Sequence, residues 1–113
     1  MQNDRMDVLL RLSDQIAQRQ GAAPEQSYVS SLLARGVDHM ARKVAEEAIE
    51  VVLATKSAES TQVIAETADL WFHSLVLLRH YGVGVEAVLA VLAQREGLSG
   101  LVEKASRSGQ VKI

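Results

Sequence analysis

The chain has 113 residues and a net charge of −2, with 48% hydrophobic but only 4% aromatic residues. This length is enough for one domain with one core, and the slightly acidic balance argues against general nucleic-acid affinity, which normally needs a basic surface. The chain has no cysteine, which excludes a disulfide framework and a thiolate metal site. The polar N-terminus lacks a signal-peptide pattern, and no apolar run approaches the ~20 residues of a membrane span, so we expect a cytoplasmic protein.

Apolar residues recur at helical spacing along most of the chain, and no stretch shows the alternation of a strand. Pro24 lies in a predicted loop, Ser27 is suited to cap the helix that follows, and Gly36 is suited to end it. The predicted helices cover residues 7–20, 28–35, 37 or 38 to about 56, 61 to about 81, and 85–95. We therefore predict an all-α fold in which residues 1–113 form a single domain, with a loop from residue 98 and a mobile tail over 108–113.

The third and fourth predicted helices are separated by a short polar connection, residues 57–60. A link this short makes the two helices antiparallel neighbours, so we expect a helical hairpin at the core of a four- to five-helix bundle. Both hairpin helices have apolar arcs wider than three short companion helices would cover. We therefore expect a homodimer that buries the spare apolar surface.

Each hairpin helix carries acidic residues three positions apart, Glu47 with Glu50 and Glu66 with Asp69. Residues three apart share one face of a helix, about 5–6 Å from each other at Cβ, and the turn can place the two pairs opposite each other. Converging carboxylates repel one another unless a cation lies between them, and an all-oxygen donor set favours a hard ion such as Mg²⁺ or Mn²⁺. The alternative is a solvated acidic face, which is common on surface helices.

At these acids the sequence resembles a known superfamily. The pattern Glu-Glu-Ala-Ile-Glu at 46–50, followed by Glu-Thr-Ala-Asp at 66–69, is similar to the signature of the all-α nucleotide pyrophosphohydrolases. The chain also resembles one branch, the stand-alone phosphoribosyl-ATP pyrophosphatases of histidine biosynthesis, over residues 27–29, 43–48, 69–73 and 99–107. The resemblance covers about residues 8–107, with small departures at Thr67 and Trp71.

The resemblance implies nucleotide binding and a Mg²⁺-dependent hydrolysis of phosphoribosyl-ATP between its α- and β-phosphates, which gives phosphoribosyl-AMP and pyrophosphate. Carried over by position, it implies the metal ligands Glu47, Glu50, Glu66 and Asp69. Glu46 and Glu47 are the two candidates for the base that takes the proton of the attacking water, and the sequence does not choose between them.

Three basic residues are candidates for contacts to the substrate phosphates. Lys43 lies in the acidic stripe, and Lys104 and Arg107 lie in a tail that could close over the phosphates. The alternatives are a local pair between Lys43 and Glu47, four positions on, and ordinary surface charge for the tail residues. Arg95 is a weaker candidate of the same kind.

His73 follows Asp69 by one helical turn and is interpreted as a core histidine, with a role as a partner of the metal ligands as the alternative. We expect His39 and His80 to lie at the surface or at an interface. The aromatic residues are interpreted as packing residues rather than platforms for a base; they are Tyr28, Trp71 and Phe72.

Three other functions compete with this interpretation. A housecleaning pyrophosphatase acting on dUTP or a damaged nucleotide uses the same chemistry, but the resemblance of the tail argues against it. A di-iron carboxylate protein needs Glu-x-x-His on two helices, and neither acidic pair has the histidine. A helical dimerisation module with a decorative acidic face predicts no hydrolysis.

Overall fold

The computed structural model describes residues 4–97, and over that range the chain is helical with no strand. The prediction of an all-α fold is confirmed. The helices are α1 Val8–Arg19, α2 Tyr28–Arg35, α3 Val37–Ala54, α4 Ser60–His80 and α5 Val85–Arg95, with short 3-10 helices at Asp4–Asp7 and Pro24–Gln26. The predicted loop, mobile tail, Lys104 and Arg107 lie outside the described residues, and the single domain over 1–113 stays a prediction.

The boundaries of α2 follow from its capping residues. Ser27 has extended backbone angles, and its side-chain oxygen accepts a hydrogen bond from the Ser30 amide at 3.0 Å, as an N-cap does. Gly36 ends α2 with a φ of 96°, a left-handed conformation that costs a glycine little, and α3 begins at the next residue. Both caps were predicted, and both are confirmed.

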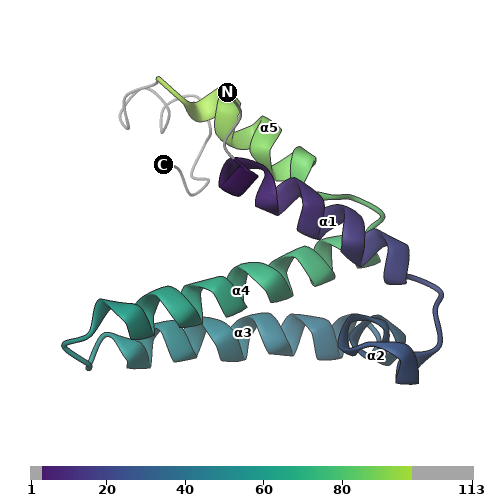
Figure 1. Cartoon of the computed structure of the whole chain (residues 1–113), viewed down its shortest axis with the longest axis horizontal. Helices are drawn as coiled ribbons and strands as arrows, with labels where there is room; N and C mark the ends of the chain where they lie inside the picture. Colours follow the sequence, from purple (N-terminus) through teal and green to yellow (C-terminus); the bar gives the residue numbers. More distant parts are fainter. Residues whose placement is uncertain (1–3, 98–113) are drawn as a thin grey trace.

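Helices α3 and α4 form the predicted antiparallel hairpin and lie side by side along most of their length (Figure 1). The turn between them is held by local hydrogen bonds. The Thr55 hydroxyl donates to the Val52 carbonyl at 2.6 Å, and the Ser57 hydroxyl accepts from the Glu59 amide at 3.0 Å. Because the turn is short, the acids in the second half of α3 come to lie near those in the first half of α4.

The hydrophobic core lies at the end of the hairpin that is remote from this turn, where α1 and α2 pack against it (Figure 1). Its buried members come from all five helices and are Ile16, Leu32, Met40, Leu75, Val76 and Val85. Apolar residues occur all round α4, a pattern that indicates burial on most sides, but in the single chain α4 is not buried in this way. The buried residues of α4 lie between His73 and Val76, whereas Ile64 is 64% exposed, because the companion helices cover only its C-terminal half.

Among residues 4–97, no single helix is long and apolar enough to cross a membrane. The pair α4 and α5 meets that test only when the two are joined across a bend of 109°.

The start of α5 is held by a residue of α1. The Val85 amide donates a buried hydrogen bond of 3.0 Å to the Ser13 hydroxyl, and this bond replaces the side-chain cap that Gly84 cannot supply. A Cβ on Gly84 would lie 2.8 Å from that hydroxyl, so the close approach requires glycine here.

Replacing Ser13 with alanine is expected to lower the free energy of unfolding by about 1–3 kcal/mol, because the Val85 amide is then buried without a partner. Urea unfolding measures the change. Ser31 provides the matched control, since its hydroxyl donates an exposed bond to the Tyr28 carbonyl, and Ser31→Ala should cost no more than about 0.5 kcal/mol. Equal losses in the two variants would show that the contact between α1 and α5 does not hold α5 in place.

Candidate carboxylate site

The structure brings acids from the two hairpin helices together. Burial first, and then the nearby charges of Asp69 and Glu50, raise the pKa of the Glu66 carboxyl above its usual range. Glu50 belongs to α3 and Asp69 to α4, so charge from both helices acts on one carboxyl group. Gln62 opposes the shift by donating a hydrogen bond of 3.1 Å to Glu66.

His73 is the buried neighbour of these acids. It is buried, and its Nε2 lies 3.8 Å from an Oε1 of Glu47, within the range of an ion pair but beyond that of a hydrogen bond. Burial, and then the charge of Lys43, lower the pKa of His73, while Glu47 and Asp69 act in the opposite direction. His73 is therefore a core histidine, as interpreted from the sequence, and it also lies beside one of the predicted metal ligands. His39 is half-buried and His80 is exposed.

The lowered pKa of His73 predicts a dependence of stability on pH. The unfolded chain takes up a proton near the ordinary histidine pKa of about 6.5, more readily than the folded protein does. The contribution of His73 to stability is thus complete above that pH and is lost as the pH falls towards the lowered value. Urea unfolding of the metal-free protein between neutral and mildly acidic pH measures the loss, and it should be weaker in His73→Gln. An unchanged pH dependence in that variant would assign the effect to other groups.

The alternative interpretation of Lys43, a pair with Glu47, is not what the structure shows. Lys43 instead lies 3.4 Å from Glu46, three positions on, and Arg42 lies 3.9 Å from the other oxygen of Glu46. The two candidate bases therefore differ in their surroundings. Glu46 is exposed and pairs with two basic side chains, whereas Glu47 is half-buried and lies beside His73.

The acidic side chains of the hairpin fit a divalent cation in part. Within residues 4–97, no group of three or more histidine or acidic side chains is already arranged as a metal site. The donor chemistry nevertheless fits, because the acids offer only carboxylate oxygens, which hard ions prefer. Burial raises the pKa of Glu66 most, and the charges of Asp69 and Glu50 add to it; a cation would offset that repulsion. The four carboxylates thus suit a hard cation in the type of their donor atoms and in their charge.

Sequence reasoning missed several neighbours of the site. Arg42 and Gln62 each lie four positions before the glutamate they contact, so helical spacing could have found them. Tyr28, whose ring lies 5.9 Å from that of His73, comes from α2, and only the fold shows this contact. Arg95 lies in the last turn of α5, and Figure 1 shows α5 on the other side of α4 from α3.

The fold defines a class: an all-helical protein built on a central antiparallel hairpin that carries acidic residues on both of its helices. Comparison with known proteins gives the family. The model of the phosphoribosyl-ATP pyrophosphohydrolase family matches residues 9–96, and the chain belongs to that family.

Curated relatives named phosphoribosyl-ATP pyrophosphatase match most of the chain. The protein of Aromatoleum aromaticum is 50% identical over 103 residues, which cover 91% of this chain and 95% of the relative. The protein of Bordetella parapertussis is 51% identical over 104 residues, with coverages of 89% and 90%. The protein of Methylococcus capsulatus is 50% identical over 102 residues, with coverages of 90% and 97%.

Proposed function

We propose that this protein hydrolyses phosphoribosyl-ATP between its α- and β-phosphates, with Mg²⁺ as the metal and Mn²⁺ as a substitute, to give phosphoribosyl-AMP and pyrophosphate. The membership of the family and the relatives of that name support the substrate and the reaction. The observation that carries the proposal in the structure is the approach of Glu50 from α3 to Glu66 and Asp69 on α4. These charges would repel a triphosphate, so the site needs a cation to accept one.

The acids would supply the metal ligands and the base, and Glu47 is a candidate for both roles. Glu47, Glu50, Glu66 and Asp69 would hold the metal, which supplies positive charge to the phosphate oxygens and to the departing pyrophosphate. Glu47 is the better placed of the two candidate bases to take the proton of the attacking water, because it is half-buried beside His73 whereas Glu46 is exposed and paired with basic side chains. Glu46 holds Lys43 and Arg42 at the edge of the site, where Lys43 is available to a phosphate oxygen.

The direct test is release of pyrophosphate from phosphoribosyl-ATP, with Mg²⁺ and with a chelator. We expect release only with the metal. A panel containing dUTP and oxidised nucleoside triphosphates tests the housecleaning alternative, which faster turnover of a panel member would favour. Iron in the purified protein, with no dependence on Mg²⁺, would instead favour a di-iron carboxylate protein.

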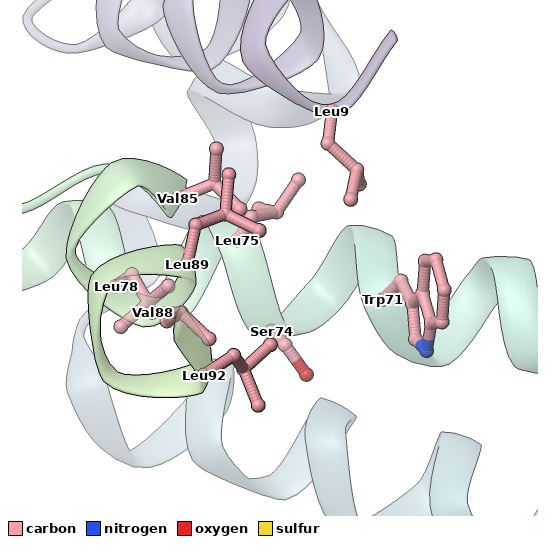
Figure 2. Close-up of a pocket in the computed structure, with 9 residues that line it drawn as sticks. All are labelled: Leu9, Trp71, Ser74, Leu75, Leu78, Val85, Val88, Leu89 and Leu92. Atoms are coloured by element: carbon pink, nitrogen blue, oxygen red, sulfur yellow. The ribbon is translucent and has the colours of Figure 1, made fainter. Parts of the chain in front are cut away.

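We also propose that two copies of the chain form a homodimer. Large apolar side chains on the hairpin are exposed in the single chain, among them Val52 at 62%, Ile64 at 64% and Trp71 at 54%. Figure 2 shows a neighbouring cavity of about 290 Å³, which Trp71 and Leu9 border together with apolar residues of α4 and α5. Large exposed apolar side chains often mark interaction surfaces in soluble proteins, and a second hairpin offers a surface of the same kind.

Light scattering is expected to give the mass of two chains for the unmodified protein. Ile64→Lys should give a single chain, because it places a charge in the contact. Met6→Lys is the matched control, since Met6 is 78% exposed but lies outside the hairpin, and it should remain dimeric. A single-chain mass for the unmodified protein would contradict the dimer without touching the proposed reaction.

A further inference from the structure

A second cavity lies between α1, α2 and α4, on the side of the core where the chain enters the hairpin. Its volume is about 210 Å³, and its lining includes Leu12, Ile16, Arg19, Ser27, Tyr28 and Phe72. Part of the lining is aliphatic. The rings of Tyr28 and Phe72 also line the cavity; their centroids are 6.1 Å apart and their planes are inclined by 17°, so the two rings are nearly parallel. Cavities that hold a whole drug-sized ligand usually measure about 300–1,000 Å³, so this one suits a single heterocycle.

The cavity adjoins the acidic site through shared aromatic contacts. The ring of His73 meets the ring of Tyr28 edge-on at 5.9 Å and the ring of Phe72 at 5.0 Å. The same histidine lies 3.8 Å from Glu47. A molecule lying against Tyr28 and Phe72 would thus be separated from Glu47 by one side chain, that of His73.

Tyr28 is more exposed than a packing residue needs to be. Its side chain is 55% exposed although its ring touches two other rings, so one part of the ring remains available to a ligand. The other described cavities lack this combination. The cavity beside α5 has an aliphatic lining around Trp71, and the one beside His80 has no phenyl, phenol or indole ring.

We propose that the cavity between α1, α2 and α4 binds the adenine base of the substrate, with the Tyr28 ring as its stacking surface. This inference rests on the proposed function and adds to it the position of the base. Gln15 and Arg19, one turn apart on α1, border the cavity and carry N–H donors suited to the ring nitrogens of a purine. Tyr28, interpreted from the sequence as a packing residue, thereby acquires a role in binding.

The test compares Tyr28→Leu with Tyr28→Phe. Stacking of a base on an aromatic side chain changes affinity by between about 5- and 150-fold. We expect Tyr28→Leu to raise the KM for phosphoribosyl-ATP within that range while kcat changes less, and Tyr28→Phe, which keeps the ring, to restore it. Tyr81→Leu is the matched control, because Tyr81 is 67% exposed and does not border the cavity, and its KM should be unchanged.

Equilibrium binding in the presence of Mg²⁺ separates the contribution of the base from that of the phosphate. AMP should bind Tyr28→Leu at least about fivefold more weakly than it binds the unmodified protein, whereas the affinity for ribose 5-phosphate, which has no base, should be the same. Equal AMP affinities, or an equal loss for both ligands, would overturn the inference. If the protein releases pyrophosphate but AMP binds Tyr28→Leu and the unmodified protein equally well, the proposed reaction is supported and the role of this cavity is contradicted. If Tyr28→Leu selectively loses AMP binding but the unmodified protein releases no pyrophosphate, the role of the cavity is supported and the proposed reaction is contradicted.

Discussion

Replacing Asp69 with asparagine is expected to lower the turnover of phosphoribosyl-ATP by more than about 100-fold, because changes to residues that only orient metal ligands already cost about 10–100-fold. The same change should leave the metal-free fold as stable as before, or more stable. Asp69 is exposed and raises the pKa of Glu66 through repulsion, so removing its charge relieves the folded state. Pyrophosphate release and thermal unfolding with a chelator measure the two effects.

Asp14→Asn is the matched control for this substitution. Asp14 is exposed on α1 and borders none of the described cavities, so its replacement should change neither turnover nor stability. Loss of folding together with activity in Asp69→Asn would show that Asp69 supports the structure and would remove it from the proposed metal ligands. Full activity in Asp69→Asn would also remove Asp69 from the proposed metal ligands, and the thermal unfolding would then show separately whether Asp69 supports the structure.

Replacing Met40 with alanine is expected to lower the free energy of unfolding by about 2–5 kcal/mol, through the lost burial and the cavity left behind. Met40 is 1% exposed and lies near the start of α3, where it belongs to the core shared by the helices. Domains of ordinary stability unfold with about 5–15 kcal/mol, so the variant loses a large part of its margin. Urea unfolding measures the loss.

Met40→Leu keeps nearly the same volume and should cost less than about 1.5 kcal/mol. A similar small loss for Met40→Ala would mean that the core collapses around the site or that stability resides elsewhere, for example in a dimer contact. Unfolding at two protein concentrations distinguishes these cases, because only the stability of a dimer depends on concentration.

Local sequence patterns predicted the helices well where a cap or a glycine marks the boundary. Helix α2, between Ser27 and Gly36, and helix α5, which begins after Gly84, have the predicted ends. Helix α3 was predicted to reach about residue 56 and ends at Ala54, where no such signal stands. The spacing of the acids and the short turn likewise predicted that acidic residues of the two hairpin helices would lie near each other.

Patterns of apolar residues predicted burial less well. Helix α4 is apolar all round, yet its first half is exposed in the single chain, since α1 and α2 pack against its other end. Periodicity shows that a face can be buried, but not which neighbour buries it. Pairing of charges was uncertain for the same reason: Lys43 has acids three and four positions away, and the folded chain places Lys43 beside the nearer one.

By itself, the sequence determined the helices and the hairpin and indicated candidate metal ligands, because these depend on contacts within a few turns of the chain. The tertiary structure decided which residues surround those acids. It placed His73 against Glu47 and brought Tyr28 from α2 to the edge of both the acidic site and the second cavity. Such contacts join helices distant in sequence, and they follow from how the side chains of α1, α2 and α4 fill a shared core.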